Sequence, residues 1–237
     1  MNLGLEGRVA LVTAASRGLG RASAAALSRE GARLVICARG EDALGEAAAQ
    51  MAGEVLAVAA DVTATETPQR LVDTAVERFG RLDVLVANAG GPPPGRALEP
   101  DDAAFEAALN ANLMTSIRLV RSAVTHMTAN GWGRICLITS SAVKQPIPHL
   151  TLSNTARAGL WAWAKTAAAD LFPRGITLNL ACPGSHATER ARALGTAGVM
   201  GDPEDFGRVV AFLCSEPAGF ISGAALQVDG ASTAGLL

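Results

Sequence analysis

The sequence alternates short apolar runs with longer amphipathic segments along almost its whole length. The apolar runs are rich in Val, Ile and Leu and have the length of buried strands; they are Val9–Thr13, Arg33–Cys37, Val55–Ala59, Val84–Ala87, Arg134–Thr139, Thr177–Leu180 and Ala225–Val228. The segments between them have helical spacing and are Leu19–Arg29, Glu41–Met51, Pro68–Phe79, Asp102–Met127, Thr155–Leu171 and Pro203–Leu213. Apolar strands separated by helices form parallel sheets that are covered on both faces. The pattern therefore predicts an α/β fold, with a doubly wound parallel sheet of about seven strands.

Length and composition limit both the number of domains and the kinds of partner. The chain has 237 residues, of which 49% are hydrophobic and 18% are charged, enough for one α/β domain with a large core. No linker or repeat interrupts it, so residues 1–237 are expected to form a single domain. The net charge is −2 and the basic residues are scattered, which argues against nucleic acid as a partner. There is no signal-peptide pattern and no apolar run of membrane-spanning length, so a cytoplasmic protein without a membrane partner is expected.

The cysteines give no sign of a metal site. All four lie in apolar contexts without a CxxC pair; they are Cys37, Cys136, Cys182 and Cys214. Such cysteines are usually reduced, buried and structural in a cytosolic protein. The sequence therefore predicts core thiols and no bound metal.

A glycine-containing turn follows the first predicted strand and leads directly into a helix. It reads Thr13-Ala-Ala-Ser-Arg-Gly18-Leu-Gly20. Glycines at a strand-to-helix junction let the backbone approach a pyrophosphate, which the positive helix N-terminus attracts. The turn therefore predicts a dinucleotide site in a Rossmann-type fold, although two glycines alone would also suit a simple packing turn.

Further motifs follow in order and resemble those of the short-chain dehydrogenase/reductase family. The turn is similar to the family's TGxxxGxG loop, with Ala14 in place of the first glycine, so the loop requires a backbone conformation that a β-carbon tolerates. The later matches are Asp61-Val62, Ala87-Asn88-Ala89-Gly90 (similar to NNAG), Asn112, Ser140, Asn179-Leu-Ala-Cys-Pro183-Gly184 and Val228-Asp229-Gly230. Each motif alone is modest, but the series at family spacing is specific. The resemblance is nearest to 3-oxoacyl-carrier-protein reductases.

The second predicted strand indicates which nucleotide is bound. An acid after this strand binds the ribose 2′-hydroxyl of NAD, whereas an arginine accommodates the 2′-phosphate of NADP. Here the strand runs into Ala38-Arg39, and Arg17 lies in the glycine loop. Two permanently charged guanidinium groups favour NADP(H). The resemblance implies that NADP(H) contacts Thr13, Ser16, Arg17, Gly18, Leu19, Arg39, Asp61, Val62, Asn88, Ala89, Gly90, Arg157, Pro183, Gly184, His186 and Thr188.

The catalytic tyrosine of this family is absent, because the chain contains no tyrosine. In the family, a serine holds the substrate oxygen, a tyrosine thirteen residues later donates the proton, and a lysine four residues after that lowers the phenol pKa. Counting from Ser140 places Ser153 at the tyrosine position and Arg157 at the lysine position; Asn112 matches the family's active-site asparagine. The resemblance therefore implies an atypical site with Ser-Asn-x-x-Arg in place of Tyr-x-x-x-Lys.

This replacement changes the chemistry that is available. A serine hydroxyl is a far weaker acid than a phenol, and arginine keeps its proton at working pH. His149, Lys144 or His186 could supply a proton, although each is more simply explained as a solvent-facing loop residue. Asn154 could polarise a substrate carbonyl together with the two serines, as in an oxyanion hole.

Two functions remain open on the sequence alone. The first is an NADP(H)-dependent oxidoreductase acting on a ketone or alcohol; the second is a catalytically silent NADP(H)-binding sensor or assembly protein. A short lid at about residues 185–202 suggests an open pocket for a bulky or carrier-bound carbonyl substrate. By resemblance, the helices 102–127 and 155–171 pair subunits, so a homotetramer is expected, with a dimer as the alternative; Trp161 and Trp163 lie on the second helix.

Overall fold

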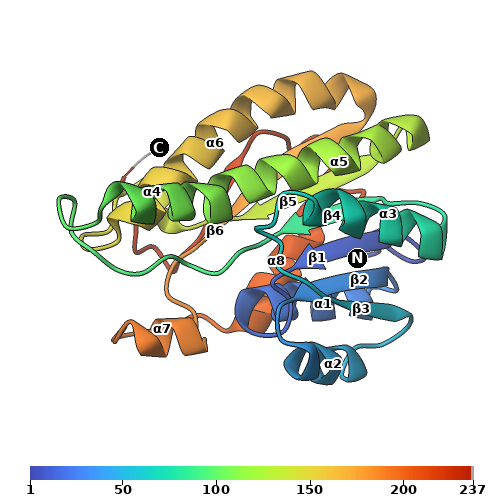
Figure 1. The fold of residues 1–237 in the computed structure, drawn as a ribbon. Coiled ribbons are helices and arrows are strands. Elements are labelled where there is room, and N and C mark those ends of the chain that lie inside the picture. The colour runs from blue at the N-terminus through green and yellow to red at the C-terminus, as the bar shows by residue number, and fades with distance from the viewer. Residues whose placement is uncertain (236–237) are drawn as a thin grey trace.

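A computed structural model describes residues 1–235, and its centre is one parallel sheet (Figure 1). The sheet has seven strands in the order β3-β2-β1-β4-β5-β6-β7. Every pairing between neighbouring strands is parallel. The strands are β1 (Val9–Thr13), β2 (Arg33–Ala38), β3 (Val55–Ala59), β4 (Val84–Ala87), β5 (Gly133–Ile138), β6 (Ile176–Pro183) and β7 (Ala225–Val228). The doubly wound Rossmann-type fold predicted from the alternating pattern is confirmed.

Helices cover both faces of this sheet (Figure 1). They are α1 (Gly18–Arg29), α2 (Glu41–Ala49), α3 (Thr67–Phe79), α4 (Asp102–Leu109), α5 (Thr115–Asn130), α6 (Thr151–Leu171), α7 (Glu189–Ala193) and α8 (Pro203–Leu213). The helices α3, α5 and α6 lie on one face, and α1, α2 and α8 lie on the other. The short helix α7 stands apart from both layers. Within residues 1–235, no helix is long and apolar enough to cross a membrane.

The strands are apolar on both sides because each side packs against a layer of helices. Alternate residues of β1 point to opposite faces: Leu11 packs with the α3, α5 and α6 layer, whereas Val12 packs with the α1 and α8 layer. Phe206 of α8 is fully buried in the second layer. All four cysteines are buried and free, as the sequence predicts.

Three helical segments differ from the sequence-based expectation. The expected helix 102–127 consists of α4, a π-helical turn η1 (Asn110–Met114) and α5. Helix α6 begins at Thr151 rather than Thr155, which places Ser153 in its first turn. The expected lid contains α7, which has only five residues and therefore too few positions for a periodic pattern.

The strand order reverses between β1 and β4, which defines where a ligand can bind. In open α/β sheets, ligands bind beyond the carboxyl ends of the strands at such a reversal. The loops that follow β1, β4, β5 and β6 therefore deserve the closest description.

Candidate active site

The ends of β1 and β4 are joined by a reciprocal pair of hydrogen bonds. The Thr13 hydroxyl donates to the carbonyl oxygen of Asn88 at 2.7 Å and accepts from the Asn88 amide N–H at 2.9 Å. Thr13 is fully buried. This pair of hydrogen bonds joins the two loops at the position where the strand order reverses. Both loops are thereby held in place beside the expected ligand site.

The glycine loop has the shape that a phosphate cradle requires. Ala14 and Gly18 adopt φ angles of 49° and 57°, in the left-handed region that favours glycine. A β-carbon on Gly20 would lie 2.3 Å from the carbonyl oxygen of Ala14, so α1 can approach the loop only because this residue is glycine. No side chain caps the N-terminus of α1 within the described chain. Its first-turn amides thus remain directed at an anion, and the residues fit a dinucleotide pyrophosphate.

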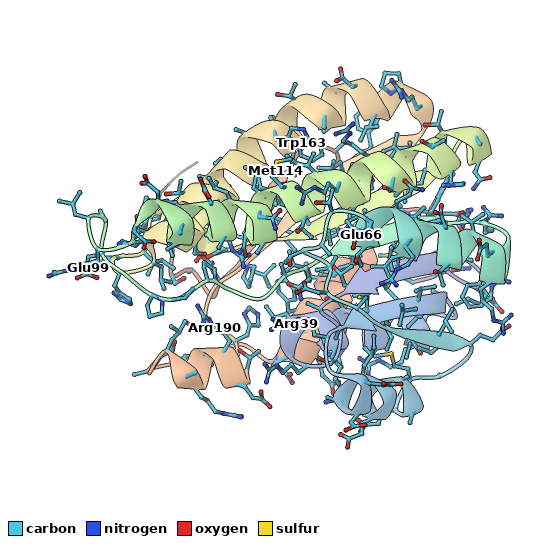
Figure 2. All side chains as sticks on the ribbon, viewed as in Figure 1. Arg39, Glu66, Glu99, Met114, Trp163 and Arg190 are labelled. Atoms are coloured by element: carbon cyan, nitrogen blue, oxygen red, sulfur yellow. The ribbon has the colours of Figure 1, made fainter. Side chains whose placement is uncertain are left out.

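The two arginines expected to select NADP(H) are both exposed. Arg39 follows the end of β2, as Figure 2 shows. The Arg17 side chain is 75% exposed and pairs with Glu189 of α7 at 2.7 Å. An exposed ion pair of this kind contributes at most about 1 kcal/mol. A phosphate can therefore displace Glu189 from Arg17 at small cost.

Asp61 and Val62 form the wall beyond β3. The Asp61 carboxylate accepts from the backbone N–H and the hydroxyl of Thr63, at 2.9 and 2.8 Å. These bonds lower the pKa of the carboxyl, and the charge of Arg39 lowers it further. Val62 packs against the core. The pair thus forms a closed turn after β3, and Ser16, Leu19, Ala89 and Gly90 lie where β1 and β4 end.

Arg157 is the centre of a buried polar cluster at the end of β5. Its guanidinium donates to the carbonyl oxygens of Ile138 and Thr139, at 3.3 and 2.5 Å, and to Oδ1 of Asn112 at 3.0 Å. The side chain is one of few buried charges, with 8% of the residue exposed. Burial lowers its pKa to about 10, and the charge of Arg190 adds to this effect. Arg157 therefore stays protonated at neutral pH.

Asn112 reaches this cluster because of the π-helical turn. Its amide nitrogen donates to the carbonyl oxygen of Ala108 at 3.4 Å, and its oxygen is left for Arg157. A π-turn adds one residue to a helical turn and re-aims the side chains that follow, which is why such turns are common at functional sites. The sequence analysis placed Asn112 in a regular helix, and only the structure shows the π-helical turn.

The two serines lie at the edge of the same cluster. Ser140 Oγ accepts from the backbone N–H of Ala142 at 3.1 Å, so its own proton remains available to another acceptor. Ser153 is buried and lies one helical turn before Arg157, on the same side of α6.

Asn154 does not point into the site as the sequence analysis expected. Its amide donates to the carbonyl oxygen of Ile147 at 2.9 Å and accepts from the Ile147 N–H at 3.4 Å. Both ends of the amide are thereby used to hold the loop before α6. An oxyanion hole built from Asn154 and the serines is therefore wrong.

The candidate proton donors occupy three different environments. His186 is buried, with its ring 5.2 Å from that of Phe206 and its Nδ1 3.2 Å from the Gly184 carbonyl oxygen, so the expectation of a solvent-facing loop histidine is wrong there. His149 is exposed, at φ 58°. Lys144 is half-buried, with Nζ 5.9 Å from the centre of the Trp161 ring. Among the described residues, neither His149 nor His186 is hydrogen-bonded to Asn112 or Arg157.

The lid leaves the end of β6 and is closed at its base. Ala187 N–H donates to Gly201 and Gly201 N–H donates to Ser185, both at 2.9 Å. Gly184 lies so close to Asp229 that a β-carbon there would be 2.7 Å from it. Thr188 caps α7 and lies beside Gly18, where a β-carbon would be 3.7 Å from it. The lid thus crosses the phosphate loop.

Arg190 is a residue of the site that the sequence analysis missed. It lies on the side of α7 that faces the loop after β4 (Figure 2), and its guanidinium donates to the Pro92 carbonyl oxygen at 2.6 Å. The only sequence signal was the charge of the Glu189-Arg-Ala-Arg192 stretch inside the lid. A contact across 98 residues cannot be inferred from that signal.

The cradle, the reversal point and the lid together define a dinucleotide-binding protein of the Rossmann type. Comparison with known proteins gives the family. A family model described as "Enoyl-(Acyl carrier protein) reductase" matches residues 13–233. The chain belongs to the short-chain dehydrogenase/reductase family of oxidoreductases.

Individual relatives are similar over most of their length. The 3-oxoacyl-[acyl-carrier-protein] reductase of Synechocystis sp. is 34% identical, with 95% of this chain and 97% of the relative covered. Dehydrogenase/reductase SDR family member 4 of Homo sapiens is 32% identical, with coverage of 95% and 87%. The L-sorbose reductase of Gluconobacter frateurii, solved with NADPH and L-sorbose, superposes with a TM-score of 0.93 at 30% identity, over 100% of both chains.

Proposed function

We propose that this protein is an NADP(H)-dependent oxidoreductase that interconverts a ketone and an alcohol at an atypical Ser140–Ser153–Arg157 site. The observation that carries the proposal is the buried Arg157–Asn112 cluster at the end of β5, which is separated by β4 from the strand β1 that leads into the phosphate cradle. NADPH-dependent reductases among the solved relatives support the choice of nucleotide. The exposed Arg17 and Arg39 supply the charges that a 2′-phosphate needs.

The two serines orient the carbonyl oxygen of the substrate. When bound, the reduced nicotinamide supplies the hydride that adds to the carbonyl carbon. Ser140 donates its proton toward the carbonyl oxygen, because its own oxygen already accepts from Ala142 N–H. Ser153 adds a second hydroxyl from the first turn of α6. Hydrogen bonds aimed at an oxygen that gains negative charge stabilise the transition state.

Arg157 contributes charge but no proton. With a pKa of about 10 it remains a cation at neutral pH, and its field favours negative charge on the nearby oxygen. The remaining guanidinium protons are left for ribose hydroxyls or substrate. Water must then protonate the product oxygen, and the loss of a positioned acid costs on the order of 10² to 10⁴ in rate. Slow turnover is the expected signature.

The second candidate is a silent NADP(H)-binding protein. It is favoured by one observation, namely that Arg157 already spends three hydrogen bonds on protein acceptors. A single experiment separates the two candidates. NADPH consumption is followed with a panel of ketones, 3-oxo acids and 3-oxoacyl thioesters, and the Ser140→Ala variant serves as the control. Slow turnover that Ser140→Ala abolishes supports the oxidoreductase, whereas tight NADPH binding without consumption supports the silent binder.

A further inference from the structure

Two guanidinium groups reach the site from different helices. Arg157 comes from α6 and is buried below the end of β5. Arg190 comes from α7 and reaches the loop after β4, where it lies about 3.1 Å from the position that a β-carbon on Gly91 would occupy. Arg157 thus contacts the end of β5 and Arg190 contacts the loop after the neighbouring strand β4, so both guanidinium groups border the same part of the sheet edge. The charge of Arg190 adds to the effect of burial in lowering the pKa of Arg157.

Neither cation has an acidic partner among residues 1–235. Carboxylates of the described chain pair instead with arginines elsewhere, namely Arg8, Arg17, Arg29, Arg78, Arg81 and Arg208. The hydrogen bonds of Arg157 and Arg190 go to carbonyl and amide oxygens, which carry no net charge. Arg157 is buried, and a buried charge without a counter-ion is costly, whereas Arg190 is exposed to solvent. A negatively charged ligand would supply the counter-ion that Arg157 lacks.

One buried donor of this pair is also unused. Nε of Arg157 is shielded from solvent and has no hydrogen-bond partner in the described chain. Buried N–H groups are nearly always satisfied in native proteins, so an unsatisfied one calls for a partner such as a bound ion or water. A carboxylate, with two oxygens and full charge, is a strong partner for a guanidinium.

We propose that Arg157 and Arg190 bind the carboxylate of an anionic carbonyl substrate, so that the protein acts on small oxo acids in preference to neutral ketones or thioesters. The catalytic part of this inference rests on the proposed function, whereas the binding part does not. The phosphates of the nucleotide are served elsewhere, by the N-terminus of α1 and by Arg17. Arg190 is then a specificity-determining residue on the lid, and Arg157 anchors the anion from beneath.

The binding arm uses a probe that cannot react. Butanoate and its neutral counterpart butanamide are titrated calorimetrically into protein saturated with NADP⁺. Butanoate is expected to bind more tightly than butanamide. Arg190→Gln should weaken butanoate about 10- to 100-fold, the effect of losing a charge-assisted hydrogen bond. Arg192→Gln is the matched control, since Arg192 is an exposed arginine on the same helix.

The kinetic arm compares 3-oxobutanoate with its methyl ester. Arg190→Gln should lower kcat/KM for the acid at least tenfold while the value for the ester is unchanged, and Arg192→Gln should change neither. Equal binding of butanoate and butanamide, or equal losses in the two variants, would overturn the inference. So would a tenfold loss of NADPH affinity in Arg190→Gln with unchanged preference for butanoate, because the cofactor phosphates would then be its partner. If no ketone turns over, the proposed function fails and the binding arm still decides the inference.

Discussion

Ala14 holds a backbone conformation that its β-carbon disfavours. Its φ of 49° lies in the left-handed region, where a residue other than glycine is strained by about 1 to 2 kcal/mol. The strain is located in the loop that borders the proposed nucleotide site. It persists because Ala14 is fixed from both ends, by the buried Thr13 and by the close approach of Gly20.

Ala14→Gly is therefore expected to stabilise the protein. The variant relieves the strain but loses some unfolded-state restriction, for a net gain of about 1 kcal/mol in the free energy of unfolding. Urea denaturation measures the change. Ala15→Gly is the control, because Ala15 is buried without a positive φ and its variant should be destabilised. A loss of stability in Ala14→Gly would contradict the argument.

The thiols illustrate how burial controls reactivity at single residues. Burial raises the pKa of Cys37 and of Cys182 to about 11, and the pKa of Cys136 lies well above its ordinary value. At pH 8 only about 0.1% of a thiol with that pKa is thiolate, the reactive form. All four cysteines are buried, so DTNB at pH 8 should leave them unmodified in the native protein, whereas all four should react in denaturant. Rapid modification of the folded protein would show that this part of the core opens.

Arg39 tests the choice of nucleotide at one position. The wild type should bind NADPH more tightly than NADH, because Arg39 and Arg17 would otherwise face no phosphate. Arg39→Asp should erode or invert the preference, since a carboxylate repels the 2′-phosphate and accepts from the ribose hydroxyls of NADH. Fluorescence titration with NADPH and with NADH gives the ratio of the two dissociation constants. Equal affinities in the wild type would defeat the assignment.

At the scale of elements, the sequence predicts well what depends on local pattern. Runs such as Val84–Ala87 are apolar throughout, and the strand begins and ends where expected. The π-turn at Asn110–Met114 was not predictable, because it differs from an α-helix only in which carbonyl each amide reaches.

The start of α6 was placed late, because Ser153, Asn154 and Thr155 look like capping residues; instead Asn154 bonds to a loop residue seven positions away. The site residues that touch across long sequence distances, Arg190 above all, carry no local signal.

The faces of α5 and α6 lead to a prediction about assembly. A groove between the two helices contains Trp163, labelled in Figure 2, and it is lined by Val120, Arg121, Val124, Trp163, Thr166, Ala167, Asp170, Leu171 and Arg174. It combines apolar surface with charges of both signs, which suits a two-fold contact between copies. Light scattering should give a mass about four times 24.1 kDa. Trp163→Arg should lower the mass, whereas Gln69→Arg on the exposed face of α3 should not.

A wild-type mass near that of one chain at micromolar concentration would contradict this assembly. A wild-type mass near twice 24.1 kDa, lowered by Trp163→Arg, would show a dimer formed through this groove. That result would contradict the tetramer. Trp161 is not a substitute for Trp163 in this test, because residues two apart on a helix face different directions.

At the scale of the whole molecule, function depends on segments from both halves of the chain. The loops after β1 and β4 form the cradle, α6 and the π-turn supply the buried cation, and the lid after β6 crosses the phosphate loop. The parallel sheet brings all of these to one edge because every strand ends there. The unusual property of this molecule is that the edge proposed for catalysis holds cations and hydroxyls but no phenol. Binding of nucleotide and substrate should therefore survive, while proton delivery is impaired.

The most direct test of this account is the turnover of ketones by the wild type and by the double variant Ser153→Tyr/Arg157→Lys, at matched NADPH saturation. The wild type should be slow, and the double variant should be faster by on the order of 10² or more, because a phenol beside a lysine restores a general acid. Ser153→Tyr alone should gain less, since Arg157 cannot relay a proton. Circular dichroism serves as the check that each variant is folded. Wild-type rates that already exceed those of the double variant would contradict the account, because another acid would then have to serve the site.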